Sequence, residues 1–386
     1  MARGRQASKV KSKLAFLIYG EQGTWKSSMC LEFAKMKRDD GKPFRVLYID
    51  AESGSVDDYI DRLENEGVNT ENIYIIYTQS LKEVSEILKK IANREQLYSY
   101  DDEGNETDEV IKDADGNDFF PDAVVIDGTT VLHMTQQESL LRLSEKRASV
   151  KANKDNLIGD EKFVKIQNAG LEFKDWNRLK FVGNDLILNL LALNVHFAVT
   201  AREKTETISV KDNTGAITSV ATGEKIPEGF KDLGYNVKTV LHMKQTEDGN
   251  IIAQVKGKDR TEVCKQGQII EEPSLLIWQS VIDKSKDNKE FVLKNNMDKS
   301  IQKDQDIYEK ELIGDKESNT QKEIKPVSTT ANLVEEIRQI FTKLDSDGKK
   351  GAMVKIKAVV PEIKTAKDIG NITDEDKLSK ILNVLK

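Results

Sequence analysis

The sequence has little of what disulfide-bonded, zinc-binding and membrane-spanning proteins depend on. Its 386 residues include two cysteines, Cys30 and Cys264, and three histidines, and no C-x-x-C pair occurs. We therefore expect neither a disulfide framework nor a structural zinc site. We do expect a reducing, cytoplasmic location. No apolar run approaches the roughly 18 residues that a membrane span needs, so we expect no membrane partner.

Aromatic residues are also scarce, at 6% of the chain, and the net charge is −7 although 32% of the residues are charged. A mildly acidic protein does not coat nucleic acid over its whole surface, but local basic segments can still bind it. Residues 1–13 are basic, and no apolar segment follows them. We interpret them as a mobile N-terminal tail and not as a signal peptide.

Short apolar runs alternate with amphipathic segments over residues 14–282. Residues 14–19, 44–50 and 122–127 are apolar or β-rich, and 81–95 has apolar residues at helical spacing. This alternation predicts an α/β core with a mostly parallel central sheet that is covered on both faces. The acidic, turn-rich residues 98–118 interrupt it, and we expect them to form a solvated hairpin insertion.

The composition changes after residue 282. Residues 283–330 are rich in Lys, Asp, Asn and Gln, which is typical of a flexible linker. Residues 331–386 contain two amphipathic segments, and they predict a small helical C-terminal module. The chain of 386 residues is long enough for two or three domains.

The stretch GEQGTWKSS nearly matches the phosphate-binding pattern G-x-x-x-x-G-K-[ST]. In such a loop the backbone amides and the lysine hold phosphate oxygens, while the hydroxyl reaches Mg²⁺. We therefore predict that Lys26 binds phosphate and that Ser27 ligates Mg²⁺. The residues expected to surround a nucleotide are Gly20, Glu21, Gln22, Gly23, Thr24, Trp25, Lys26, Ser27 and Ser28.

Trp25 stands where the pattern has its second glycine. If this position required a left-handed backbone, tryptophan would cost about 1–2 kcal/mol. If φ is helical there, tryptophan is tolerated and its ring points away from phosphate. We favour the second interpretation because Lys26 and Ser27 are retained.

Two carboxylates follow predicted strands. Strand alternation in RVLYIDAES puts Tyr48, Asp50 and Glu52 on one side, so Glu52 lies just past the carboxyl end of a strand, where α/β sheets bind ligands. There Glu52 can activate the water that attacks a γ-phosphate, although a plain solvated acid is the alternative. Asp127 ends the apolar run AVVID, and we predict that it holds Mg²⁺ together with Ser27.

Basic side chains follow later in the chain. HFAVTARE ends a predicted strand at Thr200 and Arg202, which either sense the γ-phosphate or, in the case of Arg202, carry surface charge. VKGKDRTE presents Lys258 and Arg260 two residues apart, on one side of the segment if it is extended. Because this pair comes late in the chain, it cannot easily reach the phosphate loop of its own subunit. It is either an exposed basic turn or the completion of a neighbouring subunit's site.

These segments in this order resemble the ATPase core of the RecA family. GEQGTWKSS, YIDAES, AVVIDGTTVL and HFAVTARE follow one another as in the recombinases, in which a similar IDAE segment carries the catalytic glutamate, here Glu52. The K-D-R of Lys258 and Arg260 resembles the trans-acting K-x-R of DnaB-type hexameric helicases. The layout is most similar to RecA-like ATPases of phages of Gram-positive bacteria, which act in recombination-dependent replication and single-strand annealing.

The resemblance covers roughly residues 14–282 and implies ATP and Mg²⁺ as cofactors, a homo-oligomeric ring or filament, and single-stranded DNA as a partner. In RecA-like cores two loops hold DNA, and the matching segments lie within 144–175 and 203–229. Lysines there can neutralise phosphates and aromatic rings can stack on bases, although Trp176 fits a helical core anchor better. The side chains concerned are Lys146, Arg147, Lys151, Lys154, Lys162, Lys165, Phe163 and Phe173.

We therefore predict a Mg²⁺-dependent, DNA-stimulated ATPase that acts in DNA recombination, annealing or replication. One alternative is a hexameric helicase or helicase loader of the same fold. Another is a nucleotide-binding regulatory or interaction protein with little hydrolysis, in which the C-terminal module docks a partner. The acidic net charge keeps this last alternative open.

Overall fold

The computed structural model divides the chain into two units, Met1–Ile301 and Gln302–Lys386. It describes residues 9–305 except 55, 212–214, 216, 232, 293–294 and 296–298, and then residues 333–334, 337, 340–341, 344–363, 368–369, 372 and 374–385. Residues 1–8 of the predicted tail and residues 306–332, which include most of the predicted linker, lie outside these ranges.

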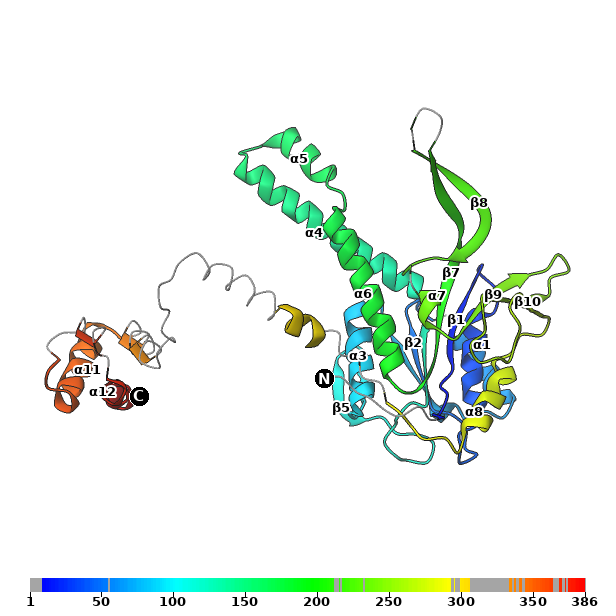
Figure 1. Cartoon of the computed structure of the whole chain (residues 1–386), viewed down its shortest axis with the longest axis horizontal. Coiled ribbons are helices and arrows are strands. Elements are labelled where there is room, and N and C mark those ends of the chain that lie inside the picture. The colour runs from blue at the N-terminus through cyan, green and yellow to red at the C-terminus, as the bar shows by residue number, and fades with distance from the viewer. Residues whose placement is uncertain are drawn as a thin grey trace. The chain divides into compact units, whose positions relative to one another are not determined.

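The first unit is built on a nine-stranded mixed sheet, in which eight strands follow the order β11-β10-β9-β1-β7-β6-β2-β3 and β8 pairs with β7 off this path (Figure 1). The pairings from β9 to β3 are parallel, whereas β10, β11 and β8 pair in antiparallel fashion. The expected α/β class with a mostly parallel sheet is thereby confirmed. The strands are β1 (Ala15–Gly20), β2 (Val46–Asp50), β3 (Ile73–Tyr77), β6 (Ala123–Asp127), β7 (His196–Lys211), β8 (Ile217–Pro227), β9 (Thr239–Gln245), β10 (Ile251–Lys256) and β11 (Ile269–Ile270).

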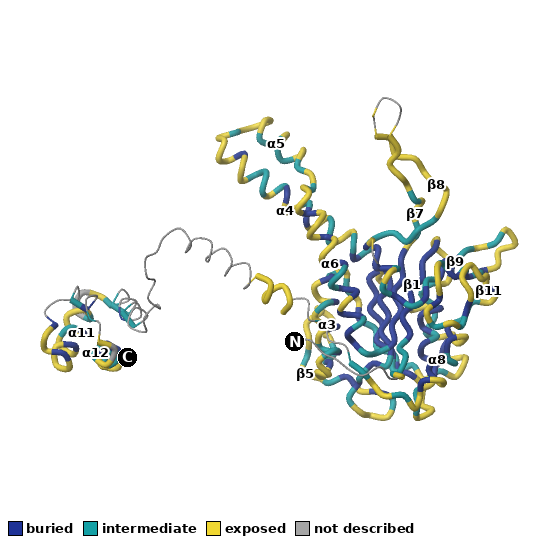
Figure 2. Tube along the Cα trace, in the orientation of Figure 1, coloured by how far each residue is buried: buried dark blue, intermediate teal, exposed yellow. Residues whose placement is uncertain are grey.

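Helices cover both faces of this sheet. In β1, Phe16 and Ile18 belong to one buried cluster, and Leu17 and Tyr19 belong to the other. Because both faces are buried, the central strands are continuous apolar runs, and they form the dark interior in Figure 2. The helices of the first unit are α1 (Lys26–Leu31), α2 (Asp57–Asn65), α3 (Leu81–Asn93), α4 (Thr129–Lys154), α5 (Gly159–Gln167), α6 (Phe173–Ala192), α7 (Leu233–Asn236) and α8 (Gln279–Ser285).

Helix α3 shows how local sequence produces these elements. The side chain of Ser80 accepts a hydrogen bond from the Glu83 backbone amide and so caps the first turn. The helix ends at Asn93 and is followed by Arg94, which has the left-handed φ of 58°. Its buried side chains recur at helical spacing and pack against the sheet, and each contributes roughly 1.5–3 kcal/mol by burial. They are Leu81, Val84, Ile87, Leu88 and Ile91.

Two further segments of the first unit have defined structure, residues 98–118 and residues 9–11. Residues 98–118 contain the antiparallel pair β4 (Tyr98–Tyr100) and β5 (Glu106–Val110), which is a hairpin with mostly exposed side chains. In the predicted tail, Val10 forms an isolated bridge with Lys289, and the Lys11 amide donates to the Lys289 carbonyl at 3.0 Å. Residues 9–11 and Lys289 therefore pack together within the first unit.

Two elements project from the core beyond the carboxyl ends of the parallel strands (Figure 1). Helices α4 and α5 form an arm, and β7 and β8 form a ribbon in which Glu203–Lys211 pairs with Ile217–Pro227. The segment 144–175, expected to be a DNA-binding loop, is therefore largely helical. Helix α4 runs without interruption from Thr129 to Lys154, because nothing in its sequence breaks it.

The second unit has a small core of its own. Its described helices α11 (Ser346–Val359) and α12 (Glu375–Leu385) contribute to one cluster of buried apolar side chains. The buried members are Ile337, Ile356, Val360, Ile363, Ile369, Leu378, Ile381 and Leu382. Among the described helices of the whole chain, none has both the length and the apolar character needed to cross a membrane.

Candidate functional site

The carboxyl ends of the parallel strands bring the predicted residues to one edge of the sheet. Gly20 of β1 lies beside Arg202 of β7, and Asp50 of β2 lies beside Asp127 of β6. Glu52 follows two residues after the end of β2. The sheet order sets β7 between β1 and β6, so the strand that carries Arg202 runs between the phosphate-loop motif and Asp127.

The loop after β1 is tightly packed at its start. A Cβ on Gly20 would lie 2.2 Å from the Met243 carbonyl oxygen of β9, so no side chain fits there. The Thr24 hydroxyl donates to the Glu21 carbonyl at 2.7 Å, and the Lys26 ammonium donates to the same carbonyl at 2.5 Å. The Lys26 side chain therefore lies against the backbone of its own loop.

Lys26 interacts electrostatically with both predicted carboxylates, Glu52 and Asp127. Burial lowers the pKa of Lys26, and the negative charges of Glu52 and Asp127 oppose this shift. A partly desolvated ammonium group can donate charge-assisted hydrogen bonds to phosphate oxygens. The two nearby carboxylates would repel such a ligand unless a divalent cation were bound with it. The site therefore contains the charge pattern that the motif predicts.

Trp25 corrects the expectation of a helical backbone at the second glycine position. Its φ of 59° and ψ of 25° lie in the left-handed region, which is the conformation for which the pattern uses glycine. The Trp25 carbonyl accepts hydrogen bonds from the Met29 amide and the Ser28 hydroxyl, both at 3.0 Å, so the first turn of α1 holds this conformation. The ring is 52% exposed and borders a hollow of about 100 Å³ that Tyr59 and Arg62 also line.

Asp127 is a buried carboxylate held by two hydroxyl groups. It is 1% exposed, and it accepts hydrogen bonds from the Tyr48 hydroxyl at 2.7 Å and from the Thr200 hydroxyl. The Thr200 oxygen in turn accepts from the Gly128 amide at 2.8 Å. Burial and then the charge of Asp127 raise the pKa of Tyr48 well above its usual value, against a smaller effect of a hydrogen bond with Ser27. These hydroxyl groups hold both carboxylate oxygens of Asp127 in place.

This arrangement fits a magnesium ion that is bound mainly by waters and by substrate phosphates. Among the described residues, no group of three or more His, Cys, Asp or Glu side chains converges on one point. Magnesium keeps several waters and uses one or two carboxylates together with substrate phosphates. The hydroxyl of Ser27 and the carboxylate of Asp127 are the protein ligands that this site offers.

Glu52 and Arg202 form an ion pair, with 3.0 Å between Glu52 Oε1 and Arg202 Nε. Asp50 fixes the turn that carries Glu52, because its carboxylate accepts from the backbone amides of Glu52 and Gly54, both at 2.8 Å. Glu52 also packs over Gly128, where a Cβ would lie 2.6 Å from Glu52 Cγ. The predicted base and the predicted sensor are therefore direct neighbours on the sheet edge.

Lys258 and Arg260 lie away from this edge within the same chain. Strand β10 ends at Lys256 opposite Val240, near the start of β9, and the Arg260 amide donates to the Lys238 carbonyl at 2.9 Å. Residues 257–260 form a turn and not an extended segment, and both basic side chains are exposed. The two side chains thus sit at the opposite end of the sheet from Gly20.

The buried carboxylate of Asp259 fixes this turn. Asp259 accepts hydrogen bonds from the Thr239 hydroxyl at 2.7 Å, from the Thr261 and Cys264 amides at 3.0 Å, and from Trp278 Nε1 at 3.3 Å. No local pattern singles out Asp259, because it stands between two basic residues and resembles an ordinary turn residue. The turn therefore holds Lys258 and Arg260 in a defined position on the surface.

A second buried group beside β1 also escaped the sequence analysis. Glu203 lies 2.7 Å from His242 Nε2 and 3.2 Å from Lys225 Nζ, and the Tyr19 ring stacks on His242 at 4.4 Å between centroids. Burial lowers the pKa of His242, and Glu203 opposes this. Its partners lie on separate strands, so no local pattern signals the group. The side of the strand on which Tyr48 lies could be predicted, because strand alternation puts it on the same side as Asp50.

The arm of α4 and α5, together with the start of α6 at Phe173, carries part of the predicted DNA-contacting set. Lys146, Lys151 and Lys154 are exposed on α4, and Phe163 and Phe173 are 63% and 82% exposed. Some basic residues are already paired: Arg147 donates to both carboxylate oxygens of Asp175 at 2.8 and 2.7 Å, and Lys165 pairs with Asp155.

The expectation that Trp176 anchors a helical core is wrong. Its side chain is 48% exposed and borders a surface hollow with Met134, Leu141 and Leu171. Helix α6 presents this position to solvent because its buried face is formed by residues such as Leu179 and Leu186.

A scan of the chain against protein-family models finds no match, and a search of curated proteins finds no significant one. What the site can do therefore follows from its own geometry. A lysine, two carboxylates in different surroundings and an arginine lie on one sheet edge, where they can bind a polyphosphate with a divalent cation and orient a water molecule.

Proposed function

We propose that the protein binds ATP with Mg²⁺ at the carboxyl edge of the sheet and hydrolyses it, and that single-stranded DNA stimulates this reaction. The observation that supports this most strongly is the meeting of Lys26, Glu52 and Asp127 at one edge. The choice of ATP, and a role in recombination, annealing or replication in the cytoplasm, rest on the resemblance to RecA-like ATPases.

The different surroundings of the two carboxylates support different roles. Asp127 is buried and bound by two hydroxyls, so its position is fixed, which suits a magnesium ligand beside Ser27. Glu52 is at the surface, with 30% of its side chain exposed, so water can reach it. A carboxylate in that position can orient the attacking water.

The Glu52–Arg202 ion pair suggests how the reaction is timed. While the guanidinium of Arg202 binds Glu52, that carboxylate is less available as a base. Phosphate oxygens bind arginine at least as well as a carboxylate does. When a γ-phosphate arrives, Arg202 would turn towards it and leave Glu52 free to hold the water.

The projecting elements connect this edge to a surface that fits single-stranded DNA. Helix α4 begins two residues after Asp127, and the ribbon of β7 continues directly from Arg202. Exposed lysines such as Lys151 and Lys154 can neutralise phosphates, and exposed rings such as Phe163 can stack on bases.

The position of Lys258 and Arg260 fits a homo-oligomer. Both side chains are exposed at the end of the sheet opposite their own phosphate loop. A basic pair of this kind can stabilise the charge that develops during phosphoryl transfer only at a neighbouring subunit's site. We propose that they do so in a ring or filament.

Hydrolysis of ATP by the purified full-length protein, measured over a titration of single-stranded DNA, tests the proposal. We expect turnover that rises with DNA, is abolished by Lys26→Ala, and falls at least 10²-fold in Glu52→Gln while ATP still binds. Asp58→Asn, an exposed acid on α2, is the matched control and should keep wild-type turnover. Equal turnover in wild type and Lys26→Ala would overturn the proposal.

A second candidate is a nucleotide-binding protein with little hydrolysis, and the pairing of Glu52 with Arg202 favours it. In that case ATP binds tightly, and wild type and Glu52→Gln turn over equally slowly with or without DNA. A helicase or helicase loader instead requires ATP-driven strand separation in one direction. A forked DNA substrate with a label on one strand separates that outcome from annealing.

A further inference from the structure

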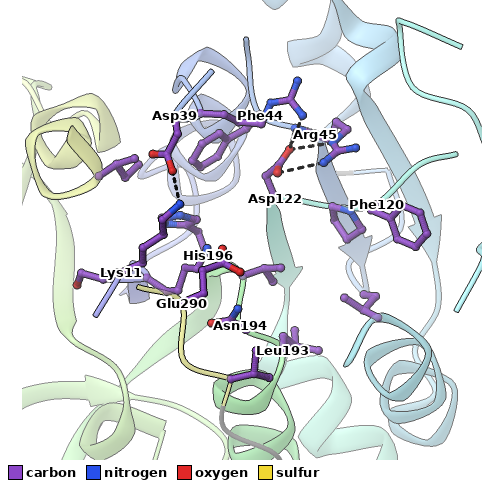
Figure 3. Close-up of a pocket in the computed structure, with 18 of the residues that line it drawn as sticks. Lys11, Asp39, Phe44, Arg45, Phe120, Asp122, Leu193, Asn194, His196 and Glu290 are labelled. Carbon is purple, nitrogen blue, oxygen red and sulfur yellow. Dashed lines mark hydrogen bonds and ion pairs between the residues drawn. The ribbon is translucent and has the colours of Figure 1, made fainter. Parts of the chain in front are cut away.

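A cavity of about 590 Å³ lies at the amino ends of the parallel strands, at the edge opposite Lys26 (Figure 3). His196, the first residue of β7, lines it, and so does Asp122, which precedes β6. Residues 11–13 form another part of its wall. Small-molecule sites have volumes of about 300–1,000 Å³, so this cavity has the size of a ligand site.

One part of the lining is apolar. Aromatic and aliphatic side chains from several elements face the cavity and would bury the body of a small molecule. They are Phe44, Ile91, Ala92, Phe120, Leu193, Val195, Ile282 and Val292.

Ion pairs hold several charged groups of the lining in place. Lys11 pairs with Asp39, and the guanidinium of Arg45 binds Asp122 through Nε at 2.9 Å and through a terminal nitrogen at 3.2 Å (Figure 3). These acids therefore already have their donors. What the cavity offers a ligand depends on the polar groups that remain.

His196 presents an unused donor to the cavity. The side chain is 5% exposed, and its Nδ1 accepts a hydrogen bond from the Leu14 amide at 3.1 Å, so the ring hydrogen is on Nε2. No group in the described part of the chain accepts that hydrogen. Burial, helped by the charges of Lys13 and Lys238, lowers the pKa of His196 well below its usual value and keeps it neutral.

Three cationic side chains add further donors. Lys13 and Arg94 line the cavity, and neither side chain hydrogen-bonds to a described residue. The buried Nε of Arg38 has no hydrogen-bond partner among the described residues, and its ion pair with Asp40 spans 3.5 Å. The buried Arg38 Nε without an acceptor costs about 1–3 kcal/mol, which an acceptor on a ligand would relieve. The half-buried Lys13 and the exposed Arg94 offer further charged donors.

We propose that this cavity binds a small organic anion, with a carboxylate or phosphate monoester group at His196 and Lys13 and an aromatic or branched apolar body against Phe44 and Leu193. The exposed Glu290 at the rim acts on Lys13 as an opposing charge, which disfavours ligands of high negative charge. Such a ligand would not compete with a nucleotide, because the two sites lie at opposite edges of the sheet.

Phenyl phosphate and benzoate serve as probes in isothermal titration calorimetry with the full-length protein. The Lys26→Ala variant is used as the background, so that the phosphate loop does not contribute. We expect at least one probe to bind, Lys13→Gln to weaken it at least tenfold, and Ala92→Trp to abolish binding by filling the cavity. Lys9→Gln, a change at a neighbouring exposed lysine, is the matched control and should leave binding unchanged.

The two probes distinguish a phosphate from a carboxylate ligand, and inorganic phosphate tests the apolar wall. Equal binding of inorganic phosphate and phenyl phosphate would overturn the assignment of an apolar body. No binding of either organic probe, or binding that Lys13→Gln leaves unchanged, would overturn the site itself. If Ala92→Trp does not fold, the comparison of Lys13→Gln with Lys9→Gln decides the question.

Discussion

Trp25 is a tryptophan in a backbone conformation that the phosphate-loop pattern reserves for glycine. The left-handed φ of 59° persists because its carbonyl is held by two hydrogen bonds from the first turn of α1. Backbone strain of this kind is often found at functional sites. Here it lies directly before the lysine that we propose to bind phosphate.

This strain is measurable as a difference between two variants. Trp25→Ala and Trp25→Gly both remove the ring, but only glycine removes the Cβ that is unfavourable at this φ. We expect the glycine variant to be more stable than the alanine variant by about 1 kcal/mol, measured by urea unfolding. An alanine variant of equal or greater stability would show that position 25 does not have a left-handed backbone.

The histidines make stability depend on pH. Burial is the first cause that lowers the pKa of His133, His196 and His242, most strongly for His196. Below the unfolded-state pKa of about 6.5, the unfolded chain binds a proton at His196 that the folded chain does not. The stability contributed by neutral His196 is therefore present above that pH and is lost as the pH falls.

For His196 alone, the expected loss between pH 7.5 and pH 5.5 is about 1.4 kcal/mol. His196→Asn keeps an acceptor for the Leu14 amide but does not titrate, so it should lack this part of the pH dependence. Urea unfolding of both proteins at several pH values measures the difference. Parallel stability curves for wild type and variant would contradict the prediction.

At the scale of elements, the junctions after β2 and β6 determine the geometry of the site. The turn after β2 places Glu52 directly over Gly128, which begins the turn from β6 into α4. Gly128 has a φ of 91°, so a side chain there is strained and also collides with Glu52. The two junctions therefore depend on each other.

A pair of alanine substitutions separates the collision from the backbone strain. Gly67 has a φ of 81°, and a Cβ there meets no atom within 4 Å, so Gly67→Ala reports strain alone. Gly128→Ala should cost about 1–3 kcal/mol more in unfolding free energy than Gly67→Ala, because Glu52 and its turn must move. Similar losses in the two variants would mean that Glu52 does not pack over Gly128.

At the scale of the whole molecule, the chain has two units that each enclose apolar side chains of their own. The first is built on the sheet and its two buried clusters, and the second on the small cluster around α11 and α12. Separate cores unfold as separate cooperative systems when few interactions join them.

We therefore expect two transitions in calorimetric unfolding of the full chain. Each should have an enthalpy of roughly 0.7 kcal/mol per folded residue near 60 °C. A protein that ends at Ile301 should lose the smaller transition and keep the larger one at the same midpoint. A single transition in the full chain, or a shift of the larger midpoint by several degrees after truncation, would show that the two units fold together.

Local patterns in the sequence were sufficient for many of the elements, although not for the last part of α4 and for α5, which lie in a segment expected to be a loop. They also singled out the main residues of the candidate site. Apolar runs and helical spacing depend on neighbouring residues alone, so the parallel strands, α3 and the loop before Lys26 could be predicted. The positions of Glu52 and Asp127 at one sheet edge also follow, because parallel strands have their carboxyl ends on the same side.

The tertiary structure decided how these residues meet. The ion pair of Glu52 with Arg202 joins residues 150 positions apart, and the hydrogen bond from Thr200 to Asp127 joins residues 73 positions apart. Both exist because β7 lies between β1 and β6. No local pattern encodes that order.

The remote position of Lys258 and the cavity beside His196 have the same origin. Each depends on where distant segments pack: Thr239 against the buried Asp259 beside Lys258, and residues 11–13 over the amino ends of the strands. The sequence by itself determined many of the elements and the types of side chain at the candidate site. Their distances and pairings came only with the packing, because these depend on contacts between residues far apart in the chain.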